Sequence, residues 1–101
     1  MIPPYVLHLH GSYGAHNREA LQTELDAAEH IGGIVVIDLR GVSVLDEETI
    51  AEFGKTRDRL RAAHGQLRLI IEDRMLEGRF HESADSKFDV YGSIEAATLD
   101  C

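Results

Sequence analysis

The stretch IVVIDLRGVSVLDEETI, residues 34–50, decides the fold that this sequence predicts. It opens with Ile34–Ile37, four β-branched residues in a row, which is typical of a strand buried on both faces of a sheet. A loop is predicted from Arg40 to Ser43. Asp46 predicts a helix N-cap, because its carboxylate can accept hydrogen bonds from N–H groups that a first helical turn leaves unpaired. We therefore expect a central strand, a loop and a helix that starts at Asp46.

The first turn of that helix carries two further acids, Glu47 and Glu48. The positive end of the helix dipole stabilises each negative charge there by roughly 0.3–1 kcal/mol. The two glutamates therefore have a purely structural explanation. A functional explanation is also open, and it depends on the residues around them.

The same stretch resembles the STAS domain of bacterial anti-sigma factor antagonists, whose typical sequence motif is close to D-L-S-G-V-x-F-[IM]-D-S-[ST]-G-L. The residues that match outright are Asp38, Leu39, Gly41, Val42 and Asp46. Leu45 fits the apolar position, and Ile50 stands for the closing leucine. Near the C-terminus, the run from Ser93 to Ala97 resembles the closing helix of the family. The resemblance thus covers nearly the whole chain.

The resemblance breaks at the residue that the family phosphorylates. Where the family carries a serine directly after the aspartate, this chain has Glu47; Glu48 replaces the second hydroxyl residue and Thr49 the glycine. In the family, a phosphate on that serine releases the domain from its anti-sigma partner. Glu47 cannot accept a phosphate, so the resemblance implies either a switch frozen in a phosphorylated-like state or a protein never switched at this position. Ser43 and Thr49 stay open as displaced phosphoacceptors.

The resemblance implies a protein-interaction module and not an enzyme. Its partner would be an anti-sigma factor or switch kinase. The expected partner-binding residues lie around one corner of the fold: Asp38, Gly41, Ser43, Asp46, Glu47, Glu48 and Thr49. Two other settings stay open, an accessory subunit of a membrane transporter and a small-molecule sensor or enzyme that uses the sheet edge near His8 and His10.

Hydrophobic periodicity predicts the remaining elements. Apolar and polar residues alternate over Tyr5–His10, which indicates a half-buried strand that Gly11 ends. Asn17 predicts the N-cap of a helix that runs to about His30. The later predicted elements are a helix over Asp46–Ala63, a strand over Gln66–Ile71, a short helix over Asp73–Gly78, a loop over Phe80–Lys87, a strand over Phe88–Tyr91, and a last helix that Ser93 caps and that turns Ile94, Ala97 and Leu99 inward.

This order predicts an α/β fold with an open, mostly parallel or mixed four-stranded sheet, as one STAS-like domain over residues 1–101. STAS domains usually open with an extra strand beside the equivalent of Tyr5–His10. The four residues before Tyr5 cannot supply that strand. We therefore expect the sheet to lack this first edge strand and to expose an edge through which the chain could form a homodimer.

Composition excludes several classes of partner. Ten basic and eighteen acidic residues give a net charge of −8, which opposes binding to nucleic acid. One basic cluster, Lys55 to Arg61, falls in the second half of a predicted helix, where cations complement the dipole. Apolar runs are far shorter than the ~20 residues that cross a bilayer, so no membrane insertion is expected. The start lacks a secretory signal and Cys101 is the lone cysteine, so we expect a cytoplasmic protein.

Six histidines raise the question of a metal site. His8 and His10 share a face of the first predicted strand, but the sequence indicates no third ligand, so we expect no metal and no cofactor. A glycine-rich phosphate loop, a G-x-S-x-G elbow and a Cys-His arrangement are all absent from the sequence. This supports a binding protein over an enzyme.

Overall fold

The computed structural model describes residues 3–82 and 87–100. Strands and helices alternate along these ranges: β1 Tyr5–Tyr13, α1 Arg18–Ile31, β2 Ile34–Leu45, α2 Glu47–Ala62, β3 Gln66–Ile70, α3 Arg74–Glu82, β4 Asp89–Tyr91 and α4 Ile94–Thr98. The strands pair in the order β1-β2-β3-β4, and each pair is parallel. The predicted α/β fold with a four-stranded sheet is confirmed, and the described sheet is parallel throughout.

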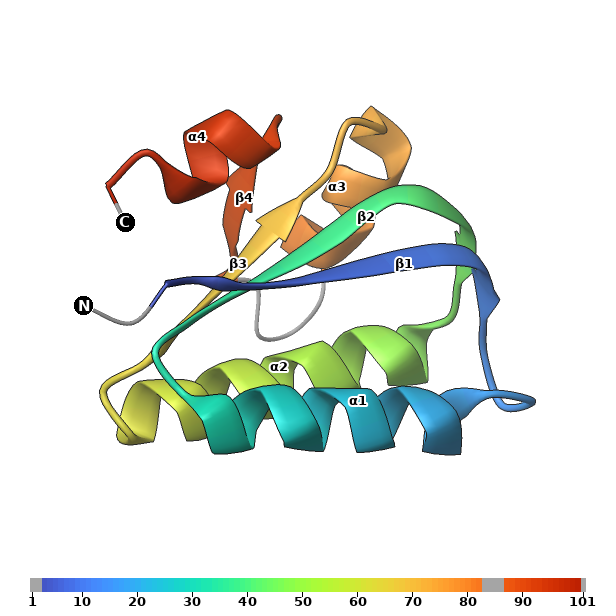
Figure 1. Cartoon of the computed structure of the whole chain (residues 1–101). Coiled ribbons are helices and arrows are strands. Elements are labelled where there is room, and N and C mark those ends of the chain that lie inside the picture. Colours follow the sequence, from blue (N-terminus) through green and yellow to red (C-terminus); the bar gives the residue numbers. More distant parts are fainter. Residues whose placement is uncertain (1–2, 83–86, 101) are drawn as a thin grey trace.

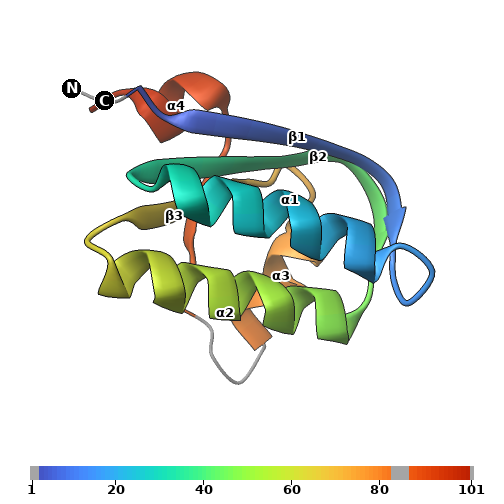
Figure 2. The same cartoon turned by 60° about the horizontal axis from the view of Figure 1, so that its bottom comes forward.

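Helices cover both faces of the sheet. Because the strand order follows the chain order, crossovers of one hand place their helices on one face. Figure 1 shows α1 and α2 side by side beneath the sheet and α4 on the opposite side, and Figure 2 shows the same pair from below. This two-sided cover explains why Val35, Val36 and Ile37, at the start of β2, are fully buried, as the unbroken β-branched run predicted.

The larger core lies between the sheet and the first three helices. α1 contributes Leu21, Leu25 and Ala28, which recur on one face of the helix. α2 contributes the predicted residues Ile50, Phe53 and Leu60. A smaller core on the other face of the sheet joins Val36 and Ile70 to Ala97 of α4.

β2 is longer than predicted, because the expected loop Arg40–Ser43 is part of the strand. Two register shifts against β1 account for the difference. His8 pairs with Asp38 but His10 with Gly41, and a second shift follows Gly11. Each shift inserts an extra residue into β2 and changes which side chains face the core. Because of these shifts, residues 40–45 do not show the regular alternation of apolar and polar residues from which a strand is predicted.

Gly41 lies at the first of these shifts, where β2 passes close to β1. A Cβ atom on Gly41 would lie 3.1 Å from the Leu9 carbonyl oxygen and 3.2 Å from the His10 Cβ. A side chain there would push the two strands apart. The glycine that matches the family pattern therefore has a packing role.

β1 also runs further than predicted, since Gly11 lies inside the strand with φ of 84° and does not end it. Within the described ranges, β1 pairs with β2 alone and so forms one edge of the sheet. The last helix differs at one residue as well. Leu99 was predicted to turn inward, but it follows the end of α4 and is 85% exposed.

The loop predicted for Phe80–Lys87 is wrong over its first three residues, because α3 continues to Glu82. The reason is aromatic packing. The Phe80 ring stacks on Phe53 with centroids 6.0 Å apart and meets Phe88 edge-on at 5.1 Å. Residues 83–86 of the predicted loop, the first two residues of the chain and Cys101 lie outside the described residues.

Arg57 does not belong to an exposed basic stripe. Its side chain is buried, with the guanidinium carbon 4.6 Å from the centre of the Phe88 ring. It also donates a hydrogen bond to the Lys87 carbonyl oxygen. Arg57 therefore fastens the segment before β4 onto α2.

Candidate functional site

The candidate site is the corner where β2 ends and α2 begins. In parallel α/β sheets, binding sites form beyond the carboxyl ends of the strands, and this corner lies at that edge. β1 ends beside it, because the Asp46 N–H donates to the Tyr13 carbonyl oxygen at 3.2 Å. We call residues 43–49 the docking corner.

Asp46 caps α2 as predicted. Its Oδ1 accepts a hydrogen bond from the Thr49 N–H at 2.9 Å and another from the Thr49 hydroxyl. Its Oδ2 accepts from Arg18 of α1 at 2.6 Å. The hydrogen bonds from Thr49, followed by the charge of Arg18, hold the pKa of Asp46 below its ordinary value. Both carboxylate oxygens are thus used within the fold.

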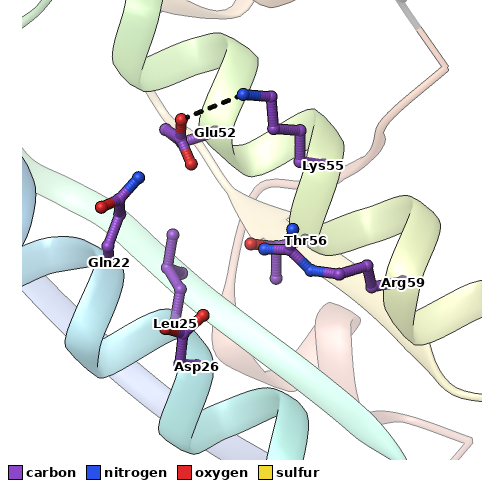
Figure 3. Close-up of a pocket in the computed structure, with 7 residues that line it drawn as sticks. All are labelled: Gln22, Leu25, Asp26, Glu52, Lys55, Thr56 and Arg59. Carbon is purple, nitrogen blue, oxygen red and sulfur yellow. Dashed lines mark hydrogen bonds and ion pairs between the residues drawn. The ribbon is translucent and has the colours of Figure 1, made fainter.

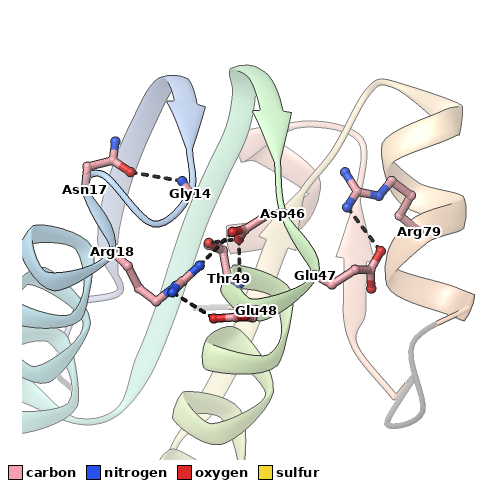
Figure 4. Close-up of polar contacts among 8 residues, drawn as sticks. All are labelled: Gly14, Asn17, Arg18, Asp46, Glu47, Glu48, Thr49 and Arg79. Carbon is pink, nitrogen blue, oxygen red and sulfur yellow. Dashed lines mark hydrogen bonds and ion pairs between the residues drawn. The ribbon is translucent and has the colours of Figure 1, made fainter.

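Glu47 and Glu48 point outward from the first turn of α2 (Figure 4). Their side chains are 74% and 75% exposed, compared with 39% for the side chain of Asp46. Glu48 pairs with Arg18 at 2.8 Å, and Glu47 pairs with Arg79 of α3 at 3.1 Å. Three carboxylates of the docking corner meet the guanidinium groups of Arg18 and Arg79, so these five side chains together carry about one net negative charge.

Sequence reasoning missed Arg18 and Arg79. Arg18 is the first residue of α1, where the positive end of the helix dipole disfavours a cation. A cation in this unfavourable position could have been recognised in the sequence as one that needs an anion from another part of the chain. Asp46 and Glu48 supply that anion. Arg79 lies in the last turn of α3, where a cation is favourable, so no comparable signal existed.

The loop before α1 is fixed by Asn17. The Gly14 N–H donates to Asn17 Oδ1 at 3.0 Å, and Asn17 Nδ2 donates to the Ser12 carbonyl oxygen at 2.9 Å. Asn17 precedes α1 as predicted, but its side chain makes no capping hydrogen bond to the helix. It holds the loop in place beside Asp46 instead (Figure 4).

Two of the predicted partner-binding residues are buried. Thr49 is 0% exposed, and its hydroxyl donates to Asp46, so it acts beneath the surface of the corner. Asp38 is 6% exposed and lies eight residues before Asp46 along β2. Gly41, Ser43, Glu47 and Glu48 are exposed, as a docking surface requires.

Asp38 belongs to a separate polar cluster on the sheet. Arg40 donates to both of its carboxylate oxygens, with Nε to Oδ1 and NH2 to Oδ2 at 2.9 Å each. The His8 ring atom Nδ1 lies 2.9 Å from Asp38 Oδ2. The hydrogen bond from the Arg40 side chain is the main reason that the pKa of Asp38 lies well below its ordinary value. The structure therefore gives Asp38 a role in holding β1 against β2.

The exposed side of α2 faces α1 across a polar hollow of about 280 Å³ (Figure 3). Both of its lining cations are paired: Lys55 Nζ lies 3.4 Å from Glu52 Oε1, and the Arg59 guanidinium lies 2.9 Å from Glu29 Oε1, which is outside the lining. A hydrogen bond with Gln22 is the main cause of a lowered pKa at Glu52. Small-molecule pockets are mostly apolar and usually larger, at roughly 300–1,000 Å³. This hollow does not have that character.

Among residues 3–82 and 87–100, no three His, Cys, Asp or Glu side chains gather as metal ligands would. His8 and His10 are both exposed on β1. In the same ranges, no helix combines the length and the apolar character needed to cross a bilayer.

Comparisons with known proteins agree on the fold. The model of the STAS domain family matches residues 2–97. The structure of the anti-sigma factor antagonist SpoIIAA in its unphosphorylated form superposes with a TM-score of 0.75 at 15% identity, over 99% of this chain and 91% of that one. A search of curated proteins found no matching sequence.

Two larger proteins contain a similar unit. Murine solute carrier 26 family member A9 (Slc26a9), an anion transporter solved in the inward-facing state, matches with a TM-score of 0.74 at 17% identity. The match covers 98% of this chain and 18% of the transporter. The crystal structure of Mglu matches at 25% identity and a TM-score of 0.60, over 70% of this chain and 18% of Mglu.

Proposed function

This chain belongs to the STAS domain family, and on that premise we propose that it is a regulatory protein-interaction module resembling an anti-sigma factor antagonist. STAS domains are generally regulatory modules without catalytic activity, so the chain acts by binding. Its partner is a kinase-like anti-sigma factor in the bacterial cytoplasm. The likeness of its fold to that of SpoIIAA supports this proposal.

The observation that carries the proposal is the exposure of Glu47 at the start of α2. It stands at the position of the phosphorylatable serine in the family pattern, and its side chain is 74% exposed. A partner that reads this position therefore meets a carboxylate of about one negative charge, compared with about −1.5 to −2 for a phosphate. The chain is consequently not switched by phosphorylation at residue 47.

A pull-down from the native host with the tagged chain tests the proposal. We expect it to recover an ATP-binding anti-sigma kinase, whose affinity for the purified chain is then measured by calorimetry. Glu48→Lys, which reverses an exposed charge in the docking corner, should weaken binding at least tenfold. Glu24→Lys, the same change at an exposed glutamate of α1, should leave it unchanged. Failure to bind any anti-sigma factor would overturn the proposal.

The second candidate function is an accessory STAS subunit of a membrane transporter. The likeness to the unit within Slc26a9, over nearly all of this chain, favours it. The same pull-down separates the two candidates, because this one requires recovery of a transporter component instead of an anti-sigma kinase.

The edge of β1 supports a further part of the proposal, self-association as a homodimer. In the described sheet, β1 pairs on one side only. An unpaired edge presents backbone N–H and C=O groups that a second copy can pair with.

A further inference from the structure

Another hollow lies beside the docking corner, between the end of β2 and α3. Its volume is about 230 Å³, and it is lined by Val42, Ser43, Leu45, Asp73, Met75, Leu76 and Arg79. Ser43 and Leu45 belong to both places, and Arg79, which lines the hollow, pairs with Glu47 of the corner at 3.1 Å. The hollow and the docking corner therefore form one continuous surface.

One exposed apolar side chain lines this hollow. The described residues include four large apolar side chains that are exposed, namely Ile31, Val44, Met75 and Leu99. Of these four, Met75 lines the hollow, and it is 82% exposed. An exposed methionine at the mouth of an apolar pocket suits a protein interface, because its flexible side chain adapts its shape to a partner.

The size of the hollow favours one side chain of a protein over a small molecule. Sites for drug-sized ligands measure roughly 300–1,000 Å³. Interfaces are commonly anchored by one or a few side chains that fill such smaller pockets near their centre. Val42, Leu45 and Leu76 supply apolar walls for an aliphatic side chain.

The lining of the hollow carries one charge of each sign, on Asp73 and Arg79. Asp73 is exposed and uses Oδ1 to accept the Met75 N–H at 2.9 Å. Glu47 lies on the other side of Arg79, and its side chain is 74% exposed. Because Glu47 pairs with Arg79, the exposed carboxylate of Asp73 is the charge that favours a partner with a cation next to its apolar anchor.

We propose that this hollow is the anchor pocket of the protein partner: an aliphatic side chain of the partner fills it, and an adjacent lysine or arginine of the partner pairs with Asp73. This inference rests on the proposed function, since the partner is the anti-sigma factor that the docking corner binds. It adds that α3 takes part in binding the partner, through the residues of α3 that line the hollow.

Calorimetry with the anti-sigma factor recovered from the host tests the anchor pocket. Met75→Lys removes the apolar side chain at the rim and adds a charge that repels the cation of the partner, so it should weaken binding at least tenfold. Leu99→Lys is the matched control, because Leu99 is 85% exposed on the opposite side of the sheet, and it should bind as the native chain does.

Asp73→Asn provides an independent readout, the dependence of affinity on salt. Removal of this rim charge should reduce the loss of affinity that added salt causes. Thermal unfolding of each variant shows that it is folded before binding is measured.

The two proposals fail in different ways. If the native chain binds the anti-sigma factor and Met75→Lys binds equally tightly, the anchor pocket is overturned while the docking corner stands. If the native chain binds no anti-sigma factor, both are overturned.

Discussion

In the proposed function, Glu47 stands where the family pattern has the serine that is phosphorylated. A stable phosphoester forms on a hydroxyl group, which the carboxylate of Glu47 does not supply. Glu47→Ser should therefore gain the mass of one phosphate when incubated with the recovered kinase and ATP, and the native chain should gain none. Intact-mass spectrometry measures both, with Glu47→Ala as the control that also lacks a hydroxyl.

A mass gain in the native chain would contradict this prediction and point to another residue. Ser43 is exposed in the docking corner, whereas Thr49 is buried and bonded to Asp46. A kinase could reach Ser43 directly but could reach Thr49 only after the first turn of α2 opened. Ser43→Ala would then abolish the gain.

Asp38 should contribute to stability in a pH-dependent way. Asp38→Asn removes an acceptor that Arg40 and the His8 ring both contact, so we expect a loss of about 1–3 kcal/mol in the free energy of unfolding at pH 7. The pKa of Asp38 is lowered in the fold. Its contribution is therefore complete above its ordinary pKa of about 3.9 and declines as the pH falls below that value.

Urea unfolding at pH 7 and at a series of lower pH values measures this difference between the native chain and Asp38→Asn. The difference should shrink as the solution becomes more acidic. Glu24→Gln, a change at an exposed glutamate of α1, serves as the control. A difference that grew toward low pH would show that Asp38 is not held in its charged form by Arg40.

At the scale of the element, the start of α2 depends on the cap that Asp46 provides. Asp46→Ala removes the acceptor for the Thr49 N–H and hydroxyl and for Arg18. Loss of such a cap should lower the Tm of a domain of this size by about 4–8 °C. Asp46→Ser restores a capping oxygen without the charge and should recover part of the loss, as measured by circular dichroism during heating.

An equal Tm for Asp46→Ala and the native chain would show that Arg18 and Thr49 find other partners. It would also separate the role of Asp46 in the helix from any role in binding. If Asp46→Ala does lower the Tm, the serine variant decides whether the capping oxygen or the negative charge matters.

The elements were predictable where one residue pattern decided them. The β-branched run at the start of β2 and the cap at Asp46 predicted a central strand and a helix, and both are present. The pattern was insufficient where a distant contact decides the structure. The shifts around Gly41 prolong β2, and the packing of Phe80 between Phe53 and Phe88 prolongs α3, and neither depends on local spacing.

The docking corner was predictable only in part for the same reason. Its acids are consecutive in the sequence, so Asp46, Glu47 and Glu48 were identified together. Their partners Arg18 and Arg79 come from two other helices, 28 and 32 residues away from Asp46 and Glu47, respectively. Folding was needed to bring these charges into contact.

At the scale of the whole molecule, the β1 edge predicts a homodimer at high protein concentration. Pairing of two such edges would satisfy backbone groups that otherwise bond to water. Sedimentation equilibrium over a range of concentrations should show a mass that rises toward twice that of the chain. His10→Lys places a full charge on this exposed strand and should shift the equilibrium toward the monomer; a native mass that never rises would contradict the prediction.

At the docking corner, the ends of β1 and β2 lie beside α1, α2 and α3. α1 contributes Arg18, α3 contributes Arg79, and α2 presents Glu47 and Glu48 between them (Figure 4). The opposite side of the sheet carries α4, whose residues Ile94 and Ala97 pack on β3 and β4. Binding at the corner and binding at α4 are therefore distinguishable within one experiment.

The most direct test is a titration of the isotope-labelled chain with the recovered anti-sigma factor, followed by the amide resonances in NMR spectra. We expect the signals of Ser43, Glu47 and Glu48 to shift or broaden first, while those of Ile94 and Ala97 stay in place. Perturbation confined to α4, with an unchanged docking corner, would contradict the account.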